Sequence, residues 1–230
     1  MWGALQMNSM KLNKAIFFDL DGVILDTESI YLKLMLEYNR KMNIEITREY
    51  YIKNLLGKTK LEISKYLSEK FEDKFEFEQY WSQLEEIREN YILNNKIKIK
   101  CGFLELMQFL KKNDYEFGIV TSNSKRLAIE LLEKSGLMIE DFKFIITREN
   151  VINPKPASDL YNEAMKKIKN DDYSFIAIED STVGIESALG AGIEVIYVED
   201  IDIVDPELKS KCLTSLKSLN DVIKLLKEMK

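Results

Sequence analysis

Five short apolar segments of this chain alternate with segments of helical periodicity, and this alternation constrains the fold more than any other feature. The apolar segments cover residues 15–19, 117–120, 144–146, 175–178 and 193–198. After Gly102, segments of helical periodicity cover residues 103–111, 125–134, 158–168, 182–191 and 216–227. Such alternation predicts a parallel sheet with right-handed crossovers and helices on both faces. We therefore expect an α/β fold with a doubly wound parallel sheet.

A long helical stretch separates the first apolar segment from the other four. Residues 29–42, 60–71 and 80–93 carry apolar side chains at helical spacing. We predict a Rossmann-like core of residues 11–27 and 96–230, split after its first strand by an all-helical cap of residues 28–95. The aromatic side chains of this insert are expected to pack within it: Tyr31, Tyr38, Tyr66, Trp81 and Tyr91.

Composition excludes several classes of protein. Hydrophobic residues make up 46% of the 230 residues and charged residues 31%, which is typical of a globular protein rather than a disordered one. A net charge of -6 disfavours nucleic acid or an anionic membrane as partner. The absence of histidine excludes Ser-His triads and His-ligated zinc, and two cysteines are too few for a disulfide scaffold. We expect a cytoplasmic monomer with no membrane partner.

Polar side chains follow four of the predicted strands, at the point where each strand ends. They form the segments Asp19-Leu20-Asp21-Gly22, Thr121-Ser122-Asn123-Ser124, Asn153-Pro154-Lys155-Pro156 and Glu179-Asp180-Ser181. Parallel strands bring their carboxyl ends to one edge of a sheet, where ligands bind in open α/β folds. The sequence therefore predicts one site that combines carboxylates, a hydroxyl, an amide and a lysine.

This combination of side chains is suited to a metal and a phosphoryl group. Crowded carboxylates repel one another unless a cation or a proton intervenes, and a set of oxygen ligands suits Mg²⁺. A lysine and a hydroxyl beside the ion suit the charge and the oxygens of a phosphoryl group. An aspartate can then attack phosphorus, while a second acid two residues later protonates the leaving oxygen and activates water.

The four segments, in this order, resemble the motifs of the haloacid dehalogenase-like (HAD) superfamily. Within it the chain is similar to the phosphatase and β-phosphoglucomutase-like branch, which has a helical cap after the first strand. The resemblance extends from about residue 14 over nearly the whole chain. It implies Mg²⁺ as the cofactor and a small phosphorylated metabolite as the partner.

The resemblance also implies a role for each matching residue. Asp19 takes the position of the nucleophile and Asp21 that of the general acid/base. Asp19, the backbone carbonyl of Asp21, Asp180 and Glu179 are the expected metal ligands. Catalysis further involves Ser122, as the phosphate-binding hydroxyl, and Lys155, as the neutralising cation.

Four more residues are implied as substrate-binding. Gly22 allows the chain reversal after Asp21, and the backbone of Asn123 lies beside the phosphate. Gly57 and Lys60 belong to the segment that resembles the specificity loop of this branch, where Lys60 can contact the distal part of the substrate. Asp26, Thr27 and Glu28 are interpreted as the start of a helix.

We expect a Mg²⁺-dependent phosphatase that hydrolyses a small metabolite such as a sugar phosphate through an aspartyl-phosphate. The first alternative is a β-phosphoglucomutase-like mutase, but Tyr31 stands where those mutases commonly carry a histidine. A dehalogenase would need neither Asp21 nor a metal. A non-catalytic phosphometabolite-binding module is the remaining alternative.

Overall fold

The computed structural model describes residues 13–56, 58, 60–71, 75–168 and 173–229. Six parallel strands form one sheet in the order β3-β2-β1-β4-β5-β6. They are β1 (Asn13–Phe18), β2 (Glu116–Val120), β3 (Ile145–Ile146), β4 (Tyr173–Glu179), β5 (Glu194–Val198) and β6 (Thr214–Leu216). The predicted fold class, a doubly wound Rossmann-like α/β sheet, is confirmed.

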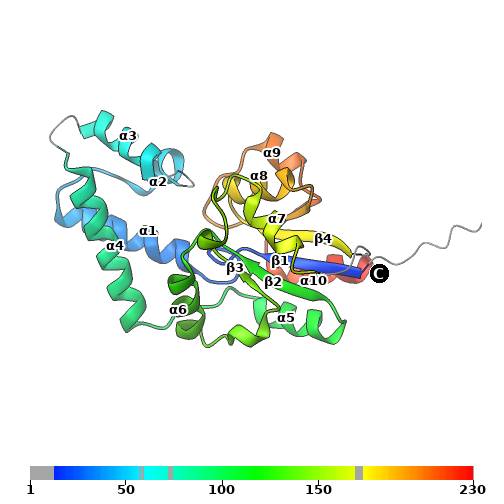
Figure 1. The fold of residues 1–230 in the computed structure, drawn as a ribbon. Helices are drawn as coiled ribbons and strands as arrows, with labels where there is room; N and C mark the ends of the chain where they lie inside the picture. Colours follow the sequence, from blue (N-terminus) through cyan, green and yellow to red (C-terminus); the bar gives the residue numbers. More distant parts are fainter. Residues whose placement is uncertain (1–12, 57, 59, 72–74, 169–172, 230) are drawn as a thin grey trace, which may run out of the picture.

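Helices cover both faces of this sheet, as Figure 1 shows. Residues of β1 are fully buried and alternate between the two faces: Ile16 and Phe18 join one apolar cluster, and Ala15 and Phe17 join the other. The first cluster includes α5 (Phe103–Lys112), α6 (Lys125–Ser135) and α10 (Leu219–Glu228). The second includes α7 (Asp159–Met165), α8 (Thr182–Gly190) and α9 (Pro206–Ser210).

Four helices between β1 and α5 form a helical insert with an apolar cluster of its own. They are α1 (Thr27–Lys41), α2 (Arg48–Asn54), α3 (Lys60–Phe71) and α4 (Phe77–Asn94). Ile201, from the loop after β5, packs against this cluster. The insert therefore touches the part of the sheet edge where β5 ends.

The two chain segments that join the insert to the core run side by side. Leu25 and Ile99 form an antiparallel bridge. The Asp26 N–H donates to the Lys98 carbonyl at 2.9 Å, and the Lys100 N–H donates to the Ile24 carbonyl at the same distance. The insert thus enters and leaves the core at a single point.

Some boundaries differ from those expected from the sequence. The helix α2 was not predicted, because this short helix has no fully buried residue to produce an apolar pattern. The edge strand β6 was not predicted either: it is partly exposed and ends at residue 216, where the sequence predicted that the last helix would begin. That helix, α10, begins at Leu219. Residues 11 and 12 of the predicted core lie outside the described residues. No helix in the described ranges has the length and apolar character needed to cross a membrane.

Candidate active site at the carboxyl end of the sheet

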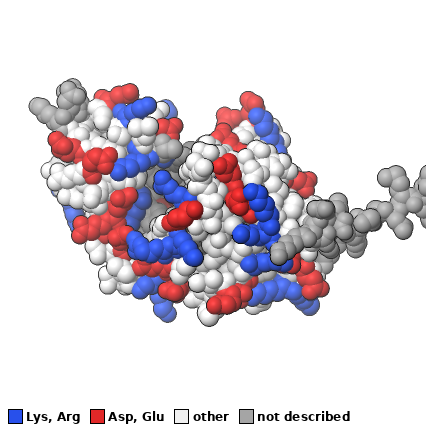
Figure 2. Space-filling view, in the orientation of Figure 1, with Lys and Arg blue, Asp and Glu red and all other residues white. Residues whose placement is uncertain are grey.

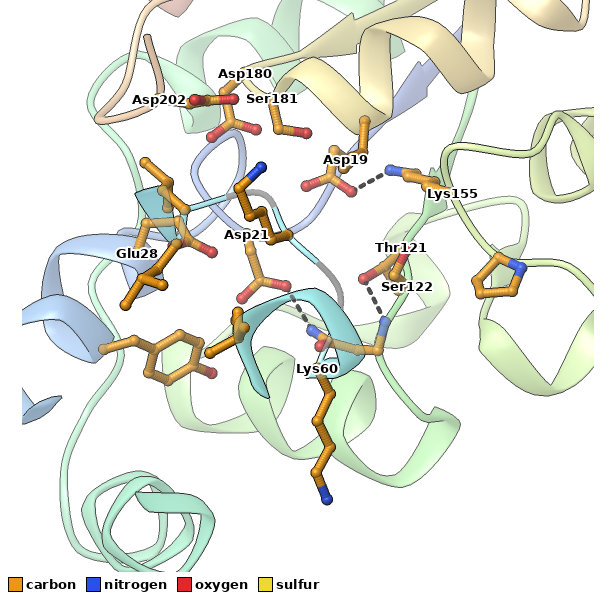
Figure 3. A pocket seen from close by; sticks show the side chains of 18 of the residues that line it. Asp19, Asp21, Glu28, Lys60, Thr121, Ser122, Lys155, Asp180, Ser181 and Asp202 are labelled. Atoms are coloured by element: carbon orange, nitrogen blue, oxygen red, sulfur yellow. Dashed lines mark hydrogen bonds and ion pairs between the residues drawn. The ribbon is translucent and has the colours of Figure 1, made fainter. Parts of the chain in front are cut away.

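The carboxyl ends of β1, β2 and β4 bring the predicted polar residues to one place, beneath the helical insert (Figure 3). Asp19 follows β1 and extends its pairing with β4, since its N–H donates to the Ile178 carbonyl at 3.1 Å. Asp180 follows β4 directly. Both side chains are buried, with exposures of 8% for Asp19 and 3% for Asp180. Because β1 and β4 are hydrogen-bonded neighbours, the two aspartates face each other across the end of the sheet.

Gly22 lets the chain turn back immediately after Asp21. Its φ of +75° is in the left-handed region, and its N–H donates to the Leu25 carbonyl at 2.8 Å. A Cβ atom at this position would lie 2.0 Å from Asp180 Oδ2. Glycine is therefore required twice here, once for the backbone conformation and once for the close approach of Asp180.

Lys155 is the buried cation of the site. Its Nζ lies 2.5 Å from Asp19 Oδ1, 2.7 Å from Glu179 Oε1 and 2.9 Å from the Val120 carbonyl oxygen. Burial alone would lower the pKa of Lys155, but the charges of Asp19 and Glu179 outweigh it and raise that pKa. The lysine stays charged and offsets part of the negative charge around Asp19.

Glu179 is fully buried behind the aspartates. Its carboxylate accepts hydrogen bonds from Lys155 and from the Tyr161 hydroxyl, and it packs against Gly184, where a Cβ would lie 2.0 Å from Oε2. Burial is the largest cause that raises the pKa of Glu179, and Lys155 opposes it. The neighbouring Tyr161 was not foreseen, because a buried tyrosine on a helix looks like ordinary packing in the sequence.

The arrangement of acids fits a divalent cation. One oxygen from each of Asp19, Glu179 and Asp180 lies within 4.8 Å of the others, and all three residues are buried. Burial, followed by the charges of Asp19 and Glu179, raises the pKa of Asp180. A hard cation bound by carboxylate oxygens relieves this repulsion, and Mg²⁺ prefers such ligands. Because Gly22 has no side chain, the Asp180 carboxylate has room to approach the proposed ion.

Asp21 is held apart from this cluster by two hydrogen bonds. Thr27 Oγ1 donates to its Oδ1 at 2.5 Å, and Asn123 Nδ2 donates to its Oδ2 at 2.6 Å. Burial and the charge of Asp19 raise the pKa of Asp21 to about 6, although both hydrogen bonds act to lower it. A carboxyl group with a pKa near 6 can both give and take a proton near neutral pH. Thr27, interpreted from the sequence as part of a helix start, thus contacts the predicted acid/base.

The loop after β2 places two hydroxyl groups near the site in different environments. Thr121 is buried, and its Oγ1 accepts a hydrogen bond from the Asn123 N–H at 3.1 Å. Ser122 is exposed and lines the cavity. The hydroxyl of Ser122 is therefore the one that can reach a ligand, while that of Thr121 shapes the loop.

A cavity of about 560 Å³ lies above these residues, between core and insert. Its floor includes Asp19, Asp21, Asp180, Ser122 and Lys155, and its upper wall includes residues from all four helices of the insert. Figure 2 shows the surface hollowed in this region, with basic and acidic side chains interspersed around it. The cavity is large enough for a small metabolite.

Several residues of the upper wall were assigned differently from the sequence. Tyr31, expected to pack within the insert, lines the cavity and packs against the core cluster; Trp81 packs against the insert cluster as expected, but lines the cavity too. Glu28, interpreted as part of a helix start, lines it too, and burial followed by the charge of Asp21 raises the pKa of Glu28 to about 8. Arg88 was not singled out, yet it lines the cavity with its guanidinium carbon 4.7 Å from the centre of the Tyr31 ring.

A spacing signal for these wall residues exists in the sequence. Glu28 and Tyr31 are three residues apart on α1, and Trp81 and Arg88 are seven apart on α4, so each pair shares one helix face. A polar and an aromatic residue on the same face of an insert helix can mark the wall of a cavity. Periodicity alone does not distinguish such a face from one that packs inside the insert.

The predicted specificity loop is only partly described. Gly57 lies outside the described residues. Lys60 lines the cavity, but its Nζ lies 2.8 Å from Glu78 Oε2, and Figure 3 shows its side chain directed away from Asp19 and Asp180. Both Lys60 and Arg88 lie over the Trp81 ring, at 5.9 and 5.7 Å from its centre, and Arg88 also lies over the Tyr31 ring.

A doubly wound sheet with a helical insert after its first strand, and with aspartates and a lysine gathered at one edge, defines a Rossmann-like α/β protein with an acidic site under the insert. Residues 16–198 match the family model of haloacid dehalogenase-like hydrolases. The chain belongs to this family.

Individual proteins are similar to this chain in sequence or in fold. The phosphorylated carbohydrates phosphatase of Thermotoga maritima is 27% identical over 184 residues, which cover 80% of this chain and 84% of the relative. Among solved structures, β-phosphoglucomutase from Clostridium difficile is 23% identical with a TM-score of 0.72, covering 94% of this chain and 96% of that one. The haloacid dehalogenase-like protein ATU0790 from Agrobacterium tumefaciens, of unknown function, is 20% identical with a TM-score of 0.80, covering 94% and 99%. The predicted family and enzyme class, a phosphoric monoester hydrolase, are confirmed.

Proposed function

We propose that this chain is a Mg²⁺-dependent phosphatase that hydrolyses a small phosphorylated metabolite of the sugar phosphate class through an aspartyl-phosphate intermediate. The observation that carries the proposal is the contact between Asp19 and Lys155 beside two further buried carboxylates, at the floor of a closed-over cavity. The name of the Thermotoga maritima relative, a phosphorylated carbohydrates phosphatase, supports the substrate class.

In the first step, a carboxylate oxygen of Asp19 attacks phosphorus, and the bond between phosphorus and the ester oxygen breaks. Asp21 gives its proton to that oxygen, so the alcohol leaves neutral. The raised pKa of Asp21, about 6, supports this role because part of the population carries the proton near neutral pH. Asp21 must exchange at least one of its hydrogen bonds to Thr27 and Asn123 to reach the leaving group.

In the second step, Asp21 takes a proton from water, and the water oxygen attacks phosphorus. The bond between phosphorus and Asp19 breaks, which releases inorganic phosphate and restores the carboxylate. Lys155, which contacts Asp19 in the structure, remains charged throughout and offsets the negative charge of the phosphoryl group.

The metal would be held by Asp19, Asp180, Glu179 and the backbone carbonyl of Asp21. When bound, Mg²⁺ acts as a Lewis acid that offsets charge on the phosphoryl oxygens. Ser122, exposed to the cavity, would donate its hydroxyl to a phosphoryl oxygen, with the backbone of Asn123 beside it.

The cavity wall supports recognition of a polar, hydroxylated substrate. Tyr31 and Trp81 provide apolar surface, while Glu28 and Arg88 provide an acceptor and a donor on the same wall. The insert, residues 28–95, would act as a cap that closes over the substrate and excludes bulk water. Gly57, before α3, and Lys60, the first residue of α3, would contribute to specificity.

A phosphate-release screen tests the proposal. The purified chain is incubated with Mg²⁺ and a panel of sugar phosphates, phosphoglycolate, nucleotides and cofactor phosphates. We expect turnover of at least one sugar phosphate, loss of activity on chelation, and loss of activity in Asp19→Asn with the fold retained. Unchanged phosphate release by Asp19→Asn would contradict the assigned nucleophile.

The same screen separates the alternatives. With β-glucose 1-phosphate as substrate, glucose 6-phosphate that appears faster than inorganic phosphate would favour a mutase. Absence of turnover on every ester, together with measurable binding of one of them, would favour a non-catalytic binding module. The tyrosine at position 31 and the absence of histidine favour water as the acceptor.

A further inference from the structure

The loop after β5 carries an acid whose charge is only half satisfied. Asp200 is half-buried as a residue, but only 8% of its side chain is exposed, and its Oδ1 lies 2.6 Å from Lys100 Nζ. Its other oxygen, Oδ2, is buried and has no hydrogen-bond partner among the residues that the structure describes. Asp202 in the same loop differs, because its Oδ2 accepts a hydrogen bond from the Thr182 N–H at 2.8 Å.

A buried carboxylate oxygen without a donor is costly to the folded state, so such atoms usually contact water or an ion. Burial raises the pKa of Asp200 and the ion pair with Lys100 opposes this effect; the pair engages Oδ1 and leaves Oδ2 free to accept a hydrogen bond. The Ile201 backbone acts on the same carboxylate and lowers its pKa, but no described group makes a hydrogen bond to Oδ2, so a bound species beside this oxygen can supply the donor.

The free oxygen of Asp200 borders the proposed metal site. A Cβ on Gly22 would lie 2.9 Å from Asp200 Oδ2 and 2.0 Å from Asp180 Oδ2, so both oxygens approach the same point beside a residue without a side chain. Asp200 is not a member of the group of three acids whose oxygens lie within 4.8 Å of one another. It is thus placed next to the metal ligands but outside the set that can bind the ion directly.

Mg²⁺ usually keeps several of its water ligands in a protein site. Each of these waters has protons that need acceptors, and residues that accept them orient the ligands of the ion. Asp200 Oδ2 lies beside Asp180 and has no hydrogen-bond partner among the described residues, so it has the chemistry of such an acceptor.

We propose that Asp200 is a positioning residue of the Mg²⁺ site, which accepts a hydrogen bond through Oδ2 from a water bound to the ion. Lys100 holds the carboxylate in place through Oδ1. Lys100 itself lies in the segment that joins the helical insert to the core, where its N–H bonds to the Ile24 carbonyl. This inference rests on the proposed metal site and adds to it a residue beyond the HAD motifs.

The test is a direct measurement of Mg²⁺ binding by titration calorimetry, without substrate, on the full chain in about 0.15 M salt, where exposed charges are screened. Asp200→Asn keeps the shape of the side chain but presents the metal-bound water with a weaker, uncharged partner. We expect its Mg²⁺ dissociation constant to rise about tenfold or more, the range typical of residues that support metal ligands.

Asp205→Asn is the matched control. It removes one negative charge from the same loop, and asparagine can replace Asp205 as the N-cap of α9, whose Glu207 N–H it accepts. Its Mg²⁺ affinity should stay within twofold of the wild type. A urea titration without metal verifies that both variants fold.

The double variant Lys100→Met with Asp200→Ala keeps the net charge and decides the question if Asp200→Asn does not fold. It should also bind Mg²⁺ about tenfold more weakly, because the acceptor is gone. Wild-type affinity in either folded variant would overturn the role of Asp200, since any water beside Oδ2 would then be independent of the metal. Failure of the wild type to bind Mg²⁺ would instead overturn the proposed metal site itself.

Discussion

Gly22→Ala gives a sharp test of the site geometry, because the chain offers a closely matched control. Gly22 and Gly192 have the same φ of +75°, so alanine brings the same backbone strain to both. That strain is about 1–2 kcal/mol for a residue with a Cβ in the left-handed region. In a chain of this length it lowers the melting temperature by about 2–4 °C per kcal/mol.

The two positions differ in what the new Cβ would meet. At Gly192 nothing lies within 4 Å, whereas at Gly22 the Cβ would lie 2.0 Å from Asp180 Oδ2. Real Cβ contacts do not fall below 3.0 Å, so Asp180 must withdraw by about 1 Å. A displacement of that size at a reacting centre can cost about a hundredfold in rate.

We therefore expect Gly22→Ala to lose at least as much stability as Gly192→Ala, and only Gly22→Ala to lose Mg²⁺ affinity and about two orders of magnitude in phosphatase kcat/KM. Thermal unfolding, titration calorimetry and phosphate release measure the three quantities. Equal activity in the two variants would refute the argument that Asp180 must approach the backbone at Gly22.

Three other predictions concern charge and protonation. Burial raises the pKa of Glu28 from the usual 4.5 to about 8, so folding favours its protonated form and the protein loses this stabilisation as the pH rises through about 8. In urea unfolding without Mg²⁺, Glu28→Gln should be more stable than the wild type at about pH 9 and equal to it near pH 4. Lys155→Met leaves two buried carboxylates without their cation, which should cost about 3–5 kcal/mol in urea unfolding and abolish phosphate release. Asn123→Ala removes a hydrogen bond that lowers the pKa of Asp21, so the alkaline limb of the kcat/KM profile should move to higher pH; an unmoved limb would separate Asp21 from the titrating group.

The core of the fold could be predicted from the sequence because its signals are local. Each buried strand, such as residues 175–178, is a short apolar run, and the polar residues that follow it must lie at one edge of a parallel sheet. The same rule brings Asp19 and Asp180 together without knowledge of any distance, whereas Lys155 lies further along the loop after β3. Weak elements escape the rule: β6 is a short, partly exposed edge strand, and its three residues carry no apolar run.

The upper wall of the cavity could not be predicted in the same way. Whether Tyr31 faces the cavity or the interior of the insert depends on how α1 tilts against α4 and the core, which no local pattern in the sequence specifies. Asp200 is a similar case, because its position beside Gly22 results from the path of a loop without regular structure. Residues placed by strand ends are therefore readable from sequence, whereas residues placed by the packing of whole helices or by loop paths are not.

The paired segments at the base of the helical insert have a consequence for how this architecture can be altered. The chain leaves the core at Leu25 and returns at Ile99, and the two connecting segments are joined by an isolated bridge. The two ends of the insert therefore lie next to each other. A foreign helical bundle whose termini are adjacent can therefore be grafted at this junction without stretching the sheet. Chimaeras of this kind would keep the reaction chemistry of one parent and acquire the substrate range of the other.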